Sequence, residues 1–177
     1  MLGSIAGTIF ISCSNDIEIV YEITAETGMP SFMVEELETF YSDSGIVKVK
    51  IYAPKLVRYD NKEASFDEYP EGINVEFFDA NLNTTATLDC QYAKYYIKQE
   101  LWEAKNNVEI VNIEKGESLN TELLFWDLRN ERIYSDKFVR IKTEKEILFG
   151  QGFESNQEFS KWRIIKPTGT ILIEEDE

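Results

Sequence analysis

Residues 88–112, LDCQYAKYYIKQELWEAKNNVEIVN, match residues 119–143, LNTELLFWDLRNERIYSDKFVRIKT, at an offset of 31 residues. The apolar positions coincide, and Lys98-Gln99-Glu100 falls on Arg129-Asn130-Glu131. Each copy has two apolar runs joined by a charged tight turn, which is typical of a β-hairpin. One hairpin cannot bury its apolar face alone, so the repeat predicts stacked antiparallel hairpins with one shared interior. A weaker third copy begins at Leu148. The matched positions are Leu88 and Leu119, Tyr95 and Trp126, Trp102 and Ile133, Ala104 and Ser135, Val108 and Val139, and Ile110 and Ile141.

The repeat also predicts which side chains face that interior. Side chains alternate between the two faces of a strand. If the Asn106-Asn107 pair lies within or beside the strand, four side chains of the first copy point inward. They are Trp102, Ala104, Val108 and Ile110. The next copy does the same with Ile133, Ser135, Val139 and Ile141. The preceding strands add Leu88, Cys90, Tyr92, Leu119, Thr121 and Leu123. A slip of one residue would reverse these assignments.

The flanking sequence continues the strand pattern from about Leu37 to Ile173. Residues 47–52, VKVKIY, alternate between apolar and polar side chains, which indicates a half-buried strand. Turn signals such as Ser42-Asp43-Ser44-Gly45 and Glu114-Lys115-Gly116 separate the runs. The one helical candidate is a short segment near residues 30–38. No alternation of helices and strands appears, so we predict an all-β fold and not a parallel α/β sheet.

Composition excludes several classes of function. The chain of 177 residues has a net charge of −15, with no basic patch of the kind that nucleic-acid binding needs. The chain has no histidine, the commonest general base and metal ligand. Its two cysteines, Cys13 and Cys90, exclude a disulfide framework. We therefore expect no catalytic residue, no metal site and no cofactor.

Residues 2–12 form an uncharged, largely apolar segment that is too short to span a bilayer as a helix. It ends in Phe10-Ile11-Ser12-Cys13, which resembles a lipoprotein cleavage site with Cys13 as the acylated residue. Phe10 stands where such sites usually have leucine. The alternative interpretation is part of an N-terminal membrane helix, which would anchor the domain equally well. We predict an anchor segment over residues 1–13, a linker with a short helix over 14–36, a β domain over 37–173 and an acidic tail over 174–177.

An ordered series of motifs resembles one family. The series is Tyr41-Ser42-Asp43-Ser44-Gly45, Ile51-Tyr52-Ala53-Pro54-Lys55-Leu56, Pro70-Glu71-Gly72-Ile73-Asn74-Val75-Glu76-Phe77, Tyr92-Ala93, Leu101-Trp102-Glu103-Ala104-Lys105-Asn106-Asn107-Val108, Leu119-Asn120-Thr121-Glu122, Trp126-Asp127 and Gly150-Gln151-Gly152-Phe153-Glu154-Ser155. In this order, from about residue 35 to 173, the chain is similar to the lipopolysaccharide export protein C family (LptC). Asn106 stands where the family often has glycine, and asparagine is the next best residue for an unusual backbone at a bend.

The resemblance implies an open, twisted antiparallel β-jellyroll, folded like a taco. It implies a periplasmic component at the inner membrane, held by lipid on Cys13 or by a membrane segment. That component receives lipopolysaccharide from an ATP-binding-cassette (ABC) transporter and passes it to a periplasmic bridge of the same fold, joined edge to edge by strand pairing. The lipid would travel in an apolar groove. We predict that groove to be lined by Leu88, Tyr92, Trp102, Ala104, Val108, Ile110, Leu119, Leu123, Phe125, Ile133, Val139 and Ile141.

The same residues also allow other interpretations. A jellyroll surface lipoprotein that binds sugar or protein would have a filled, dry interior and function on its loops. Gly150-Gln151-Gly152 lacks the third glycine and the following helix of a phosphate loop, so a bend is expected there. Cys90 is expected to be a buried small apolar residue and not a nucleophile. Tyr92, Trp102 and Phe125 fit a core role and a lipid-contact role equally.

Overall fold

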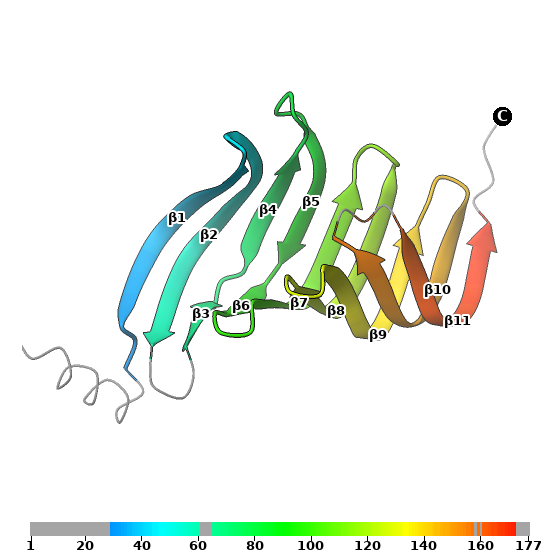
Figure 1. The fold of residues 1–177 in the computed structure, drawn as a ribbon. Helices are drawn as coiled ribbons and strands as arrows, with labels where there is room; N and C mark the ends of the chain where they lie inside the picture. The colour runs from blue at the N-terminus through cyan, green and yellow to red at the C-terminus, as the bar shows by residue number, and fades with distance from the viewer. Residues whose placement is uncertain (1–28, 61–64, 158, 160, 173–177) are drawn as a thin grey trace, which may run out of the picture.

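One sheet of antiparallel strands makes up the part of the chain that the structure, a computed structural model, describes: residues 29–60, 65–157, 159 and 161–172. The all-β prediction is confirmed, because these residues contain eleven strands and no helix. The strand order is β11-β10-β9-β8-β7-β5-β4-β2-β3-β6, with β1 paired to β2 and β6 also paired to β7 (Figure 1). The strands are β1 (Phe32–Asp43), β2 (Ile46–Asp60), β3 (Ser65–Tyr69), β4 (Ile73–Phe78), β5 (Thr84–Cys90), β6 (Tyr92–Tyr96), β7 (Leu101–Asn112), β8 (Glu117–Asp127), β9 (Arg132–Lys142), β10 (Glu146–Asn156) and β11 (Trp162–Leu172).

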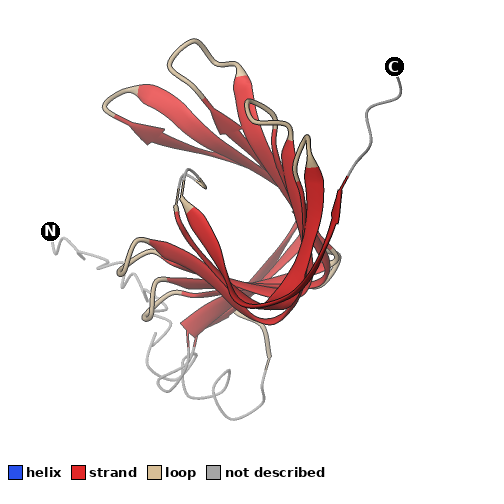
Figure 2. Cartoon of the chain, turned by 90° about the vertical axis from the view of Figure 1, so that its right-hand side faces the viewer, coloured by secondary structure: helices blue, strands red, loops and turns tan. Residues whose placement is uncertain are grey.

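The sheet folds over on itself into an upper and a lower wall, named as they appear in Figure 1. The long strand β7 pairs with β5 in the upper wall and with β6 in the lower wall. Likewise β2 pairs with β4 above and β3 below. The short strands β3 and β4, and β5 and β6, are therefore two long strands that are each broken at the fold line. Viewed along the sheet, the two walls form a U that is open on one side (Figure 2).

Special backbone conformations sit along the line where the strands bend, which we call the corner. In β7, Asn106 and Asn107 have φ angles of 62° and 52°, and the β7–β8 register shifts between Lys105 and Val108. Gly152 in β10 has a φ of 82°. The inward assignment required the Asn106-Asn107 pair to lie within or beside the strand, and the pair lies within β7. Bulges of this kind bend a strand and let it continue in the other wall.

Two hydroxyl groups satisfy backbone groups that the bend in β8 and β9 leaves out of the ladder. The register between these strands shifts between Thr121 and Phe125. Thr121 Oγ1 donates to the carbonyl of Phe138 at 2.9 Å, and the backbone N–H of Lys137 donates to Ser135 Oγ at 3.0 Å. Because unpaired buried backbone groups are costly, these small polar residues make a buried bend tolerable.

The predicted helix near residues 30–38 is wrong, since strand β1 occupies this segment from Phe32 onward. Its apolar residues Val34 and Leu37 are three apart and both pack on the core, a spacing that suggests a helix. A local break in the ladder explains the spacing: Glu36 has a φ of 52°, and neither Glu36 nor Pro54 opposite it is paired, although the register is the same on both sides. The sheet thus begins before Leu37, the predicted start of the β domain.

The predicted anchor over residues 1–13 and the acidic tail lie outside the described residues. Within the described part of the chain, no helix has the length and apolar character needed to cross a membrane.

Substitution of Gly72 tests how closely the main chain is packed at the corner. Gly72 has a φ of 83°, and a Cβ at this position would overlap the carbonyl group of Cys90. We expect Gly72→Ala to destabilise the protein by about 3 kcal/mol or more, because backbone strain and overlap with rigid main chain add together. Gly45, with a φ of 80° and open space around it, is the matched control. Gly45→Ala should cost only about 1 kcal/mol. Equal losses in urea unfolding of the two variants would contradict a close-packed corner.

Candidate functional site

A ladder of apolar side chains lines the inside of the upper wall without interruption. Cross-strand pairing joins one residue from each successive strand, so the stripe runs the length of the sheet. Its ends are threonines on the two edge strands, and everything between is aliphatic. This central ladder consists of Thr39, Ile51, Val75, Leu88, Ile110, Leu119, Ile141, Leu148 and Thr170.

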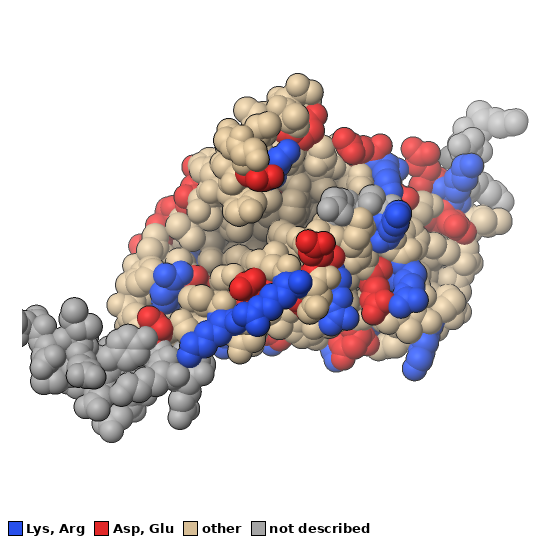
Figure 3. Space-filling model, viewed as in Figure 1, with Lys and Arg blue, Asp and Glu red and all other residues tan. Residues whose placement is uncertain are grey.

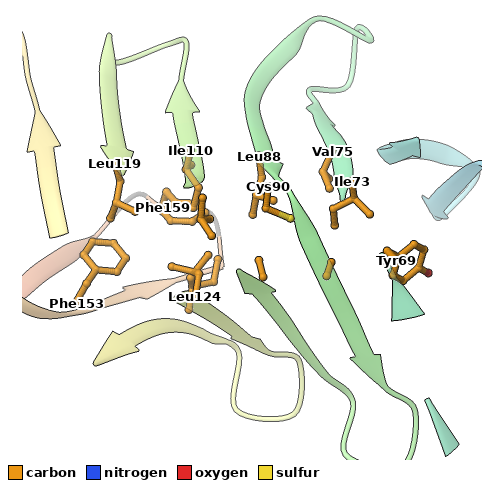
Figure 4. Packing of buried hydrophobic residues seen from close by; sticks show 14 of the residues in the cluster. Tyr69, Ile73, Val75, Leu88, Cys90, Ile110, Leu119, Leu124, Phe153 and Phe159 are labelled. Atoms are coloured by element: carbon orange, nitrogen blue, oxygen red, sulfur yellow. The ribbon is translucent and has the colours of Figure 1, made fainter. Parts of the chain in front are cut away.

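The inner face of the lower wall lies opposite this ladder. Leu124 and Phe153 point up from β8 and β10 toward Ile110 and Leu119 (Figure 4). Leu124 and Phe153 are each 1% exposed, so the two walls share one core. We refer to the space between the walls, with its lining, as the groove. Figure 3 shows the open side, hollowed below the β4–β5 hairpin and lined there mainly by uncharged side chains.

Most of the predicted groove residues face this shared core. Val108, Ile133 and Val139 are at most 1% exposed. The predicted interior positions Cys90, Thr121 and Ser135 are buried as well. The predicted groove residues that lie in the core cluster or pack against it are Leu88, Trp102, Ala104, Val108, Ile110, Leu119, Ile133, Val139 and Ile141.

Tyr92, Leu123 and Phe125 do not face the core, so their predicted orientation is wrong. The Tyr92 hydroxyl donates to Glu68 at 2.7 Å, and the Phe125 ring stacks on Tyr134 at 5.2 Å. Leu123 pairs with Lys105 and is absent from the core cluster.

Breaks in the strand alternation at the corner explain these errors. In β8 the inward residues are Leu119 and Thr121 before the bend but Leu124 and Trp126 after it. In β10 the inward position Gly150 is followed by Phe153, three residues later, where strict alternation would give Gly152. Strict alternation therefore missed Leu124, Trp126 and Phe153. In the sequence, only Gly152 and the hydroxyl of Thr121 could have signalled these bends. Neither shows on its own at which residue the alternation between inward and outward side chains changes.

A second continuous row of cross-strand neighbours lies on the lower wall, at the open side of the groove, which we call the mouth. We call this row the lower lip. It differs from the central ladder because indole, phenol and charged groups replace aliphatic ones. Such amphipathic side chains suit a boundary between an apolar space and water. The row consists of Phe32, Arg58, Asp67, Tyr95, Trp102, Trp126, Ile133, Ser155 and Trp162.

Aromatic stacking holds the middle of the lower lip. The Trp102 ring lies 4.7 Å from Tyr95 and 5.4 Å from Tyr69, stacked on both. Burial raises the pKa of Tyr69 and of Tyr95 above the ordinary tyrosine value, so both phenols stay neutral at physiological pH.

An ion pair marks the lower lip near the β1 end. The Arg58 Nε and Nη2 groups donate to the two Asp67 carboxylate oxygens at 2.5 and 2.6 Å. Arg58 also lies over the Phe32 ring, 5.0 Å from its centre. Asp67 is only 4% exposed, so its charge depends on the arginine.

Two contacts cross the mouth from the lower lip to the upper wall. Phe77 of β4 approaches Trp126 of β8, with ring centres 5.9 Å apart. The Trp162 indole N–H donates to a Glu117 carboxylate oxygen at 3.2 Å. Glu117 continues the upper-wall row that contains Phe77, through Ala86 and Asn112. The mouth is therefore bridged in its middle and toward the β11 end.

Two small pockets lie between the walls. One pocket, between Ile51, Val75 and Leu88 above and Trp102, Leu124 and Trp126 below, has a volume of about 20 Å³. A second, near Ile110, Leu119 and Phe153, has the same volume of about 20 Å³. Each is large enough for about one water molecule.

The other buried charged residues are paired outside the groove. Glu103 accepts from the Tyr96 hydroxyl at 2.9 Å and from Lys105 at 2.8 Å, and burial raises the pKa of Tyr96 to about 12. Hydrogen bonds from Asn130, with Arg132 nearby, hold the pKa of Asp127 below its ordinary value. Among the described residues, no group of three or more acidic or cysteine side chains could hold a metal ion.

Cys90 lies in the core cluster, as expected of a small apolar residue. Burial raises the pKa of its thiol, which disfavours the reactive thiolate. Among the described residues, the groove thus presents aliphatic walls and an amphipathic lower lip.

Comparison with known families gives one match over most of the chain. The family model described as "Lipopolysaccharide-assembly, LptC-related" matches residues 10–171. Comparison with curated proteins gives no significant match.

Removal of one partner from the ion pair between Arg58 and Asp67 tests how far the stability of the protein depends on the pairing of these two charges. We expect Arg58→Met to lower the free energy of unfolding by about 2–3 kcal/mol, because it leaves Asp67 buried and unpaired. The double variant Arg58→Met/Asp67→Leu should recover most of that loss. Chemical denaturation of both proteins and of Asp67→Leu gives the coupling energy. Additive losses would show that the two side chains do not depend on each other.

Proposed function

The chain belongs to the LptC-related family of lipopolysaccharide-assembly proteins, and from this we propose that it carries lipopolysaccharide in the groove between its two walls. The family membership makes it a component of lipopolysaccharide transport. In the proposed role it receives lipopolysaccharide from the ABC transporter of the inner membrane and passes it to a periplasmic bridge protein. The observation that carries this proposal is the central ladder, an aliphatic stripe that continues from β2 to β10 and ends in threonines on the edge strands β1 and β11.

The physical chemistry of the cargo favours such a stripe. Each acyl methylene group that leaves water gains about 0.8 kcal/mol. A conduit must therefore shield the chains at every step, and a groove with continuous walls allows them to slide without full exposure. The open side leaves room for the phosphate-bearing sugars in solvent. This suits a chain with a net charge of −15, which would repel anionic headgroups from its surface.

The two edge strands support edge-to-edge assembly with neighbours of the same fold. Strand β1 pairs only with β2, and β11 pairs only with β10, so each presents an unpaired edge among the described residues. Both are 11 to 12 residues long and largely exposed. Free edges of this length invite pairing with another strand. In the proposed assembly, one edge meets the transporter side and the other meets the bridge, so the stripe continues from chain to chain.

The alternative role as a sugar- or protein-binding surface protein predicts a filled interior. The small volume of the two pockets agrees with that alternative. The open side of the U, the amphipathic lower lip and the family favour lipid transport. No catalytic step and no cofactor is part of the proposal, and the sequence lacks a GxxxxGK[ST] phosphate loop, so the energy would come from the transporter.

The protein is proposed to act in the periplasm, held at the inner membrane by lipid on Cys13 or by an N-terminal membrane segment. We expect mass spectrometry of protein from cells to show an acylated Cys13 at the mature N-terminus. Cys13→Ala should leave the precursor uncleaved. Wild-type protein that retains residues 1–12 would exclude the lipid anchor and leave the membrane segment.

Neighbouring aromatic residues on opposite faces of β8 give a matched test of the carrier role. Trp126 faces the groove and Phe125 faces outward, stacked on Tyr134. We expect p-benzoylphenylalanine at position 126 to form adducts with lipopolysaccharide on irradiation of living cells. The same group at position 125 should form few or none.

Two further positions extend this test. Trp102 and Ile133 also face the groove, and p-benzoylphenylalanine at either should give adducts. Equal labelling at positions 125 and 126 would mean that lipid contacts the surface at random. Absence of adducts at all three inward positions, with the proteins folded, would contradict the carrier role.

A further inference from the structure

One residue between the walls belongs to no strand. Phe159 lies between β10 and β11, yet its side chain is only 7% exposed and belongs to the core cluster. Its ring stacks near that of Phe153, with centres 6.4 Å apart. Figure 4 shows the ring between the upper residues Ile110 and Leu119 and the lower residues Leu124 and Phe153. Phe159 therefore occupies the groove itself.

The surroundings of Phe159 are those that an acyl chain would need. The pocket beside its ring is lined by Ile110, Leu119 and Ile141 of the upper wall and Phe153 of the lower wall. Three of these belong to the central ladder, so the site is continuous with the rest of the groove. With the ring in place, about 20 Å³ remains, which cannot admit a hydrocarbon chain.

The connection that carries Phe159 is bound at its own ends and to β8, where the Trp126 indole N–H donates to Gln157 Oε1 at 3.0 Å. The backbone N–H of Phe159 donates to the carbonyl of Asn156 at 3.1 Å, and that of Lys161 donates to Asn156 Oδ1 at 2.9 Å. Phe159 has a φ of 52°, a conformation that a bulky residue adopts only at an energetic cost. The neighbouring Trp162 donates across the mouth to Glu117. The ring can therefore leave the groove without breaking any pairing within the sheet.

We propose that Phe159 is an internal plug, which fills an acyl-chain site in the empty protein and is displaced when lipid enters. This inference rests on the proposed function. It follows from two observations: only about 20 Å³ is free in the pocket beside Phe159, and this core residue lies outside the strands that form the walls. Displacement of Phe159 would open the β11 half of the groove, next to one of the two unpaired edges.

Removal of the plug should strengthen lipid binding, although it removes a buried ring. A protein whose binding site is filled most of the time binds with an affinity reduced by the open fraction. We expect Phe159→Ala to bind purified lipopolysaccharide, labelled on its sugar with a fluorophore, about fivefold more tightly than wild type. Phe138→Ala is the matched control, because Phe138 is 53% exposed outside the groove. Its affinity should equal that of wild type.

A second measurement uses the unchanged protein, in case Phe159→Ala unfolds. Hydrogen exchange of the peptide around Phe159 should become faster when lipopolysaccharide is added, because the ring leaves its pocket. Slower or unchanged exchange there would overturn the plug, as would unchanged or weaker binding by folded Phe159→Ala. If wild type still binds in those cases and position 126 still forms adducts, the carrier role stands without the plug. If wild type does not bind at all, both proposals fail.

Discussion

The fold depends on one constraint: long antiparallel strands must turn a corner together. A straight sheet of this size would leave its apolar face in water, whereas a sheet folded over buries that face against itself. Each long strand solves the turn with its own local device. Gly72 and Gly152 accept a left-handed backbone, β7 uses Asn106 and Asn107, and Thr121 and Ser135 donate or accept for displaced backbone groups. The groove exists because these devices fall on one line across the sheet.

The groove has to combine two opposing requirements, which are space for acyl chains and a well-packed interior. A carrier needs an interior that admits acyl chains, but an empty apolar cavity destabilises the protein that contains it. Here the empty state is closed by the protein's own side chains, with Phe77 against Trp126 across the mouth and Phe159 between the walls. Aromatic rings at the mouth can exchange one apolar neighbour for another at little cost. These closing groups are compatible with a transport role, because Phe159 lies outside the strands and the contact between Phe77 and Trp126 is made by their rings and not by the backbone.

Charge is arranged to leave the interior neutral. The acidic residues that are buried each have a partner, as Asp67 has Arg58 and Glu103 has Lys105 and Tyr96. The central ladder is aliphatic, whereas the lower lip combines aromatic rings with one ion pair. A lipid with apolar chains and a charged, sugar-bearing head matches these two kinds of surface, since its two parts would meet them without a buried unpaired charge.

The sequence by itself determined the all-β class, the hairpin repeat at 31 residues and most of the inward-facing residues, because alternation and periodicity are local properties. It also indicated the bend at Asn106-Asn107. Only the tertiary structure decided what depends on local breaks in the strands: that Leu124 and Trp126 face inward while Leu123 and Phe125 do not, and that the segment carrying Val34 and Leu37 is a strand. A bulge shifts the parity of every residue beyond it, and its location is set by the neighbouring strands. The placement of Phe159 between the walls likewise depends on contacts with strands far away in the sequence.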